Sequence, residues 1–143
     1  MSVKGNQIFL SQAGPVPHLP ENGKVVTFNG FSRRVKTIAS GAPLLVDVEF
    51  GRGWELFALS QGDFSGAPEG SPALPNTGSL VRVKADGTFK IIADELNQPT
   101  SMEIIGNTAY IVTLSGDVWA IGNISGSSPG QPHWKHHIHR GSN

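Results

Sequence analysis

Three acidic residues are the strongest candidates for chemistry in this chain. Asp47 and Glu49 are two positions apart in the alternating run 45–50, so on a strand both side chains would point to one face. Glu103 has a comparable place in a later run of the same kind. Convergent carboxylates can hold Ca²⁺ or another hard cation. The sequence therefore predicts a divalent-cation site at these three residues. In the alternative interpretation the acids are solvated or pair with basic residues such as Arg33, Arg34 and Arg82.

Four histidines near the C-terminus form a second candidate metal site: His133, His136, His137 and His139. On a strand, His137 and His139 would share a face, and such a pair can chelate Zn²⁺, Cu²⁺ or Ni²⁺. However, no carboxylate or cysteine lies close to them in sequence, and they follow a Gly/Ser/Pro-rich linker at 125–131. We therefore prefer a final strand or a loose end with adventitious metal affinity.

Two Gly/Pro-rich segments, 13–22 and 62–77, have no strand pattern and are predicted to be surface loops. Because each follows an equivalent strand, we expect both to emerge on the same side of the molecule. They contain His18, Asp63 and Phe64, which we take as candidate ligand-binding residues.

The aromatic residues bear on whether the ligand could be a glycan. A sugar-binding platform would need exposed aromatic rings in loops, and Phe31 and Phe64 are the candidates. Trp54, Trp119 and Tyr110 instead lie in strand-like runs, where aromatic side chains usually fill the space between sheets. No Gly-x-Ser-x-Gly motif is present, and no nucleophile–base pair can be inferred. The sequence therefore favours binding over catalysis.

Composition limits the remaining classes of function. The chain has 143 residues, 11 basic and 11 acidic side chains, and no cysteine. A nucleic-acid partner would require an excess of positive charge, and the lack of cysteine excludes disulfides and thiolate metal sites. No apolar run is long enough for a membrane helix, and residues 1–5 do not begin a signal peptide. We expect one domain without a membrane or nucleic-acid partner, cytoplasmic as the sequence is written.

The elements that position these residues are short strands. Alternating runs, each bounded by Gly, Pro, Asn or Asp, extend along the chain, and no long helical stripe occurs. The runs also repeat, because Gly23-Lys24-Val25-Val26 corresponds to Gly78-Ser79-Leu80-Val81 and to Gly116-Asp117-Val118-Trp119. We predict an all-β protein made of three four-stranded units at about 1–40, 41–96 and 97–140, with a tail at 141–143.

These repeats resemble the six-bladed β-propellers of the NHL and regucalcin-like superfamily, and most of all the scytonemin-cluster (ScyD/ScyE-type) propeller family. The blocks at 78–88 and 92–101 carry the resemblance, together with the Gly/Pro insertion after Leu59-Ser60. The resemblance implies four-stranded propeller blades, whose innermost strands follow Pro43 and Pro99 and carry the three acids. It also implies a divalent metal at the channel mouth, as in the regucalcin-like lactonases, although their ligands do not map one for one onto this chain.

Three blades cannot close a ring, and each end of an open half would leave an apolar face bare. Two copies arranged head to tail would cover both faces, so we expect a homodimer that closes a six-bladed propeller. The alternative is that the chain is a fragment. The main hypothesis for function is a binding or scaffold module for a small molecule or glycan. A metal-dependent lactonase-like hydrolase and a propeller lectin are the alternatives.

Overall fold

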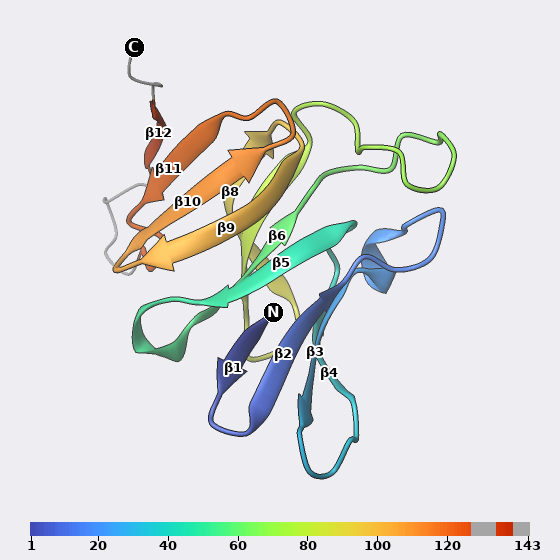
Figure 1. Ribbon diagram of the computed structural model, residues 1–143, viewed down its shortest axis with the longest axis vertical. Coiled ribbons are helices and arrows are strands. Elements are labelled where there is room, and N and C mark those ends of the chain that lie inside the picture. The colour runs from blue at the N-terminus through green and yellow to red at the C-terminus, as the bar shows by residue number, and fades with distance from the viewer. Residues whose placement is uncertain (127–133, 139–143) are drawn as a thin grey trace.

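The computed structural model describes residues 1–126 and 134–138, and in these ranges the chain is all-β. Twelve strands form three four-stranded antiparallel sheets (Figure 1). We call these sheets blades 1, 2 and 3 in chain order. Because each sheet is one contiguous segment of four sequential strands, the arrangement fits a β-propeller-like architecture.

The strands of each blade follow one another from one edge of its sheet to the other. Blade 1 contains β1 (Ser2–Lys4), β2 (Gln7–Gln12), β3 (Lys24–Asn29) and β4 (Lys36–Ser40). Blade 2 contains β5 (Leu45–Phe50), β6 (Leu56–Ser60), β7 (Gly78–Val83) and β8 (Phe89–Leu96). Blade 3 contains β9 (Pro99–Ile105), β10 (Thr108–Thr113), β11 (Val118–Gly122) and β12 (Trp134–Ile138). Two short 3₁₀ turns, η1 (Pro20–Asn22) and η2 (Arg52–Trp54), interrupt the connections.

The glycine that opens the repeated motif has a structural reason in two of the three copies. A Cβ on Gly23 would lie 1.6 Å from the carbonyl oxygen of Ala42, and one on Gly78 would lie 2.5 Å from the ring of Pro99. In both cases the chain that leaves one blade for the next passes directly over the glycine. The repeated glycine is thus explained by the close passage of the connection between blades, which leaves no room for a Cβ.

The first strands of the blades lie side by side. β5 contacts β9 on one side and β1 and β2 on the other, as Figure 1 also shows. This arrangement stacks blade 2 between blades 1 and 3, so the protein has two interfaces between blades. Within the described residues, no helix is long and apolar enough to cross a membrane.

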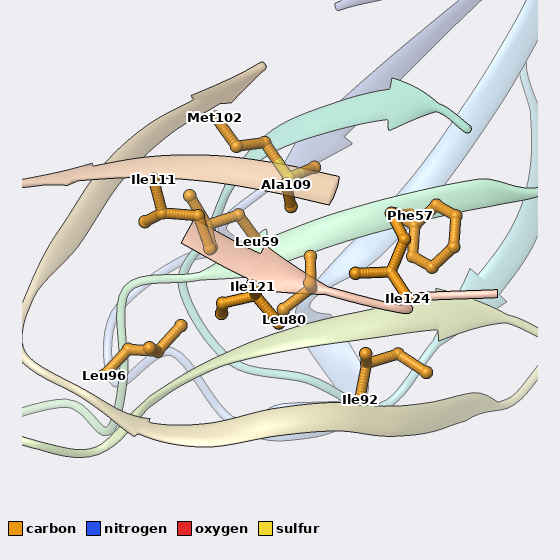
Figure 2. Packing of buried hydrophobic residues seen from close by; sticks show 10 residues of the cluster. All are labelled: Phe57, Leu59, Leu80, Ile92, Leu96, Met102, Ala109, Ile111, Ile121 and Ile124. Carbon is orange, nitrogen blue, oxygen red and sulfur yellow. The ribbon is translucent and has the colours of Figure 1, made fainter. Parts of the chain in front are cut away.

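The interface between blades 2 and 3 is the larger apolar cluster (Figure 2). Blade 2 contributes Phe57, Leu59, Leu80, Ile92 and Leu96, and blade 3 with its following turn contributes Met102, Ala109, Ile111, Ile121 and Ile124. All ten side chains are buried, and most are long aliphatic groups from alternate positions of their strands. We call this cluster the 2–3 interface.

The interface between blades 1 and 2 is built from smaller side chains. Its buried residues are Phe9, Val25, Ala42, Leu45, Val48, Leu56, Ala58 and Val81. On β7, Leu80 enters the 2–3 interface while its neighbour Val81 enters this one. We call this cluster the 1–2 interface.

Two aromatic residues lie elsewhere than the sequence suggested. Trp54 does not belong to a strand: it ends η2, has a positive φ of 60° and is 60% exposed. Tyr110 is in β10 but on the face opposite the 2–3 interface, where it is 36% exposed. Both were expected between blades. Trp54 belongs to a turn instead of a strand, and Tyr110 is one position away from the inward-facing residues of β10, so neither side chain enters the core.

Candidate binding sites

The two loops that carry the candidate ligand-binding residues meet on one side of the molecule. The β2–β3 loop and the long β6–β7 loop extend to the same side of the blades in Figure 1. The imidazole of His18 contacts the ring of Phe64 edge-on, with 5.2 Å between the ring centroids. The structure therefore brings His18 and Phe64 together across two loops that are 46 residues apart in the chain. We call this side of the molecule the loop face.

The β6–β7 loop is held in shape by its own hydrogen bonds. The backbone N–H of Asp63 donates to the Thr77 hydroxyl at 2.8 Å, and the Leu74 N–H donates to the Asp63 carbonyl at 2.9 Å. The Ala73 N–H donates to the side-chain oxygen of Gln61, while Gln98 donates to the Ala73 carbonyl. The loop is thus fixed at both ends, although it contains no regular structure.

Asp63 lines a hollow of about 300 Å³ between this loop and the β4–β5 linker. Phe89, Ile91 and Val81 form its apolar wall, and its polar lining comes from Ser60, Asp63, Thr77, Ser79 and Asp94. His18 and Phe64 are not part of its lining, so only one of the three candidate ligand-binding residues borders the hollow. Asp94 and Ser79 were not anticipated, because only the packing of β7 and β8 beside the loop brings them to Asp63.

The polar lining of this hollow accepts hydrogen bonds more than it donates them. The Ser60 hydroxyl already donates to the Pro43 carbonyl at 2.6 Å, and the Thr77 hydroxyl donates to the Leu74 carbonyl at 2.8 Å. Asp63 and Asp94 have no ion-pair partner in the described part of the chain. A ligand that donates hydrogen bonds would suit these two carboxylates.

Asp47, one of the three predicted metal ligands, is already engaged by the fold. Its Oδ2 accepts a hydrogen bond from the Met102 N–H at 2.9 Å, and its Oδ1 accepts one from the Val48 N–H at 2.8 Å. The N-terminal ammonium of Met1 lies 3.5 Å from Oδ1. Because Met1 precedes blade 1 and Met102 belongs to blade 3, the carboxylate of Asp47 connects all three blades.

Asp47 and Glu49 lie on one face of β5, and Glu103 of β9 is close enough for its charge to act on Glu49, although Glu103 pairs with Tyr110 on the outer side of blade 3. Burial raises the pKa of Glu49 above its ordinary value, the negative charges of Asp47 and Glu103 raise it further, and the N-terminal ammonium opposes them. Yet residues 1–126 and 134–138 contain no group of three or more His, Cys, Asp or Glu side chains placed to hold a metal ion. The three acids share a region without the geometry of a cation site.

His137 has a structural partner that its sequence neighbours do not reveal. Its Nε2 lies 3.0 Å from Oδ1 of Asp117, and its ring contacts the Trp119 ring at 4.8 Å between centroids, with the two planes tilted by 55°. Since β11 and β12 pair in register, strand pairing brings in the carboxylate that the local sequence lacks. His136 is exposed on the other face of β12, whereas His133, His139 and the 141–143 tail lie outside the described residues.

Comparison of the chain with protein-family models, with curated proteins and with solved structures found no match.

Proposed function

We propose that this chain is a three-bladed half of a six-bladed β-propeller, which closes as a homodimer and binds a small polar molecule on its loop face. The single observation that carries the assembly is the apolar outer face of blade 3. The binding role rests on the hollow beside Asp63.

The outer face of blade 3 has exposed apolar side chains on three of its strands. The register places Ile105, Tyr110 and Val112 on the face opposite the 2–3 interface, together with Trp134 and Ile138 of β12. Each is at least 36% exposed. Exposed apolar side chains on three strands of one face are typical of an interface, and the exposed Glu103 and His136 lie on the same face beside them.

Blade 1 has a complementary outer face. Its register places Val3, Ile8, Leu10 and Phe28 on the side opposite Phe9 and Val25, which belong to the 1–2 interface. If the outer face of blade 1 packs on the outer face of blade 3 of a second copy, two such contacts cover both ends of each chain. Two halves then complete six blades.

The loop face supports a small donor-rich ligand better than the alternatives. Phe64 is half-buried against His18, so it is not the exposed platform that a lectin would need at this face. A lactonase-like hydrolase would need its metal ligands free, whereas Asp47 already accepts hydrogen bonds from two backbone N–H groups. The hollow lined by Asp63 and Asp94 needs neither a metal nor an exposed ring.

The assembly is tested by measuring mass by light scattering after size exclusion. We expect a mass of twice 15.2 kDa for the wild-type chain. Tyr110→Glu would introduce a charge into the proposed contact and give the monomer. Ile91→Glu is the matched control, because Ile91 is a 61% exposed strand residue of blade 2 and lies on neither outer face. A wild-type monomer at the highest soluble concentration would contradict the assembly.

The binding role is tested separately by ligand-observed NMR with a panel of primary amines and monosaccharides. We expect compounds that bind the wild-type chain and lose binding in Asp63→Asn and Asp94→Asn. Asp86→Asn is the control, because Asp86 lies in the exposed β7–β8 turn away from the hollow. Binding that is insensitive to both hollow variants, or no binding at all, would overturn this part of the proposal.

A further inference from the structure

A second hollow, of about 310 Å³, opens at the other end of the 1–2 interface. Its floor is apolar and is formed by Phe9, Ile38, Phe50 and Leu56, which are members or neighbours of that interface. Its rim comes from the β1–β2, β5–β6 and β7–β8 connections, with Lys4, Trp54 and Lys84 among the rim residues. The loop face is formed by other connections, so the two hollows are separate.

Trp54 is the most unusual residue at this rim. It is 60% exposed, and its ring meets Phe50 edge-on at 5.4 Å between centroids. Its φ of 60° is a conformation that costs free energy for a bulky side chain and that glycine adopts easily. Such outliers gather at binding sites.

The charge at the rim comes from lysine. The Lys4 ammonium lies over the Trp54 ring, 4.8 Å from its centroid, and has no carboxylate partner in the described part of the chain. Lys84 is 3.8 Å from Asp86 in an exposed pair. The acid of the lining, Glu55, lies 3.9 Å from the Arg82 guanidinium, and its Oε2 is buried without a hydrogen-bond partner among the described residues.

From these groups we infer that this hollow binds a small planar carboxylate, whose ring lies on the apolar floor beside Trp54 and whose carboxylate pairs with Lys4. A mostly apolar hollow with a few polar groups at its edge is the usual form of a small-molecule site. Its volume is close to the lower limit for such sites, which suits a molecule of one or two rings. The hollow lies at the interface of blades 1 and 2 and not at the outer faces proposed to pair in the homodimer.

The test uses 1-naphthoate as the probe and isothermal titration calorimetry as the measurement. We expect binding to the wild-type chain, and binding weaker by about tenfold in Lys4→Gln, which removes the charge-assisted contact. Trp54→Gly is expected to weaken binding by at least about tenfold while keeping the fold, because glycine tolerates the φ of this position. The neutral analogue 1-naphthylmethanol should bind more weakly than the acid and should not respond to Lys4→Gln.

Matched controls separate this hollow from general surface effects. Phe31→Gly removes another exposed aromatic ring, 83% exposed in the β3–β4 loop, and Lys90→Gln removes an exposed lysine of β8. Both controls should bind 1-naphthoate as the wild type does. The inference is overturned if the wild-type chain does not bind the acid, if Trp54→Gly or Lys4→Gln binds it unchanged, or if the neutral alcohol binds equally well. Asp63→Asn tests the loop-face site alone and should leave this binding intact.

Discussion

The two interfaces between blades differ in the size of the side chains that fill them. The members of both interfaces are buried, but the 2–3 interface is packed mainly by long side chains such as Phe57, Leu59 and Ile111. The 1–2 interface contains two alanines, Ala42 and Ala58, and it is bordered by a hollow at each end. Both hollows that we propose as binding sites border this interface, and a further hollow of about 280 Å³ lies between blades 2 and 3 beside Phe50 and Ile104.

The connections between blades strengthen the same contrast. At the β8–β9 connection, Gln98 donates a hydrogen bond from its side chain to the Ala73 carbonyl at 2.7 Å, which ties the β6–β7 loop to blade 3. At the β4–β5 connection, Gly41, Ala42 and Pro43 line the loop-face hollow instead. One connection has a polar side chain that closes the gap, and the other has small residues that leave it open.

Leucine truncation provides the largest test of this comparison. Leu80 is fully buried in the 2–3 interface, whereas Leu56 belongs to the 1–2 interface and borders the Trp54 hollow. We expect Leu80→Ala to lower the free energy of unfolding by about 4 kcal/mol and Leu56→Ala by about 2 kcal/mol. The difference arises because Leu80 would leave a closed cavity, while the space left by Leu56 would join an existing hollow. Urea unfolding measures both.

The control for these variants is Phe31→Ala, which removes an 83% exposed ring and should change the free energy of unfolding by less than about 0.5 kcal/mol. Equal losses for Leu80→Ala and Leu56→Ala would mean that the two interfaces are equally well packed.

Asp47 provides the second test, because one carboxylate reaches both neighbouring blades in different ways. Its bond from the Met102 N–H is shielded, since the Asp47 side chain is 14% exposed, whereas the Met1 ammonium is largely in solvent. We expect Asp47→Ala to lower the free energy of unfolding by about 2 kcal/mol, mainly by leaving a backbone N–H of β9 unpaired. Acetylation of the N-terminus should cost less than about 1 kcal/mol. If acetylation costs as much as the substitution, the contact with blade 1 is the important one.

The fold was predictable from local pattern, and the neighbours of single side chains were not. The alternating runs and the repeated glycines predicted the strands and the three four-stranded sheets, because both features depend on residues that are close together in the sequence. Trp54, the last residue of η2, was predicted to begin a strand, since Trp54-Glu55-Leu56 continues the alternation, and this error concealed the exposure of Trp54. The positive φ of Trp54 is enough to turn its side chain from the expected buried position to an exposed one.

The candidate sites show the same limit. Strand periodicity predicted one face for Asp47 and Glu49, and the contact between His18 and Phe64 was compatible with equivalent loops on one side. The partners of Asp47 and His137 come from other strands, so no local spacing could indicate them. Asp94 joins Asp63 only through the packing of a loop on a sheet.

Trp119 tests how far the tight packing of blade 3 extends toward its outer edge. Its half-buried ring contacts the Lys135 ammonium at 4.7 Å and the His137 ring at 4.8 Å, both from β12. We expect Trp119→Ala to lower the free energy of unfolding by about 1–2 kcal/mol, less than a truncation in the 2–3 interface, because the ring is only partly removed from water. Hydrogen exchange should show loss of protection in β12 and unchanged protection in β9. Loss of protection across both would place Trp119 in the core.

Glu49 gives the smallest expected effect and tests the polar edge where blades 2 and 3 meet. Burial and the charges of Asp47 and Glu103 raise its pKa in the folded chain, so the folded state binds this proton at higher pH than the unfolded state does. The ionised carboxylate therefore destabilises the fold at pH 7, and this cost disappears as the pH falls through the raised pKa toward the ordinary value of 4.5. Glu49→Gln should raise the urea midpoint at pH 7 and have little effect near pH 4.5. Glu69→Gln, in the exposed β6–β7 loop, is the control and should show no such dependence. A Glu49→Gln variant that is less stable than wild type at pH 7 would mean that the carboxylate is held by a favourable partner, as Asp47 is.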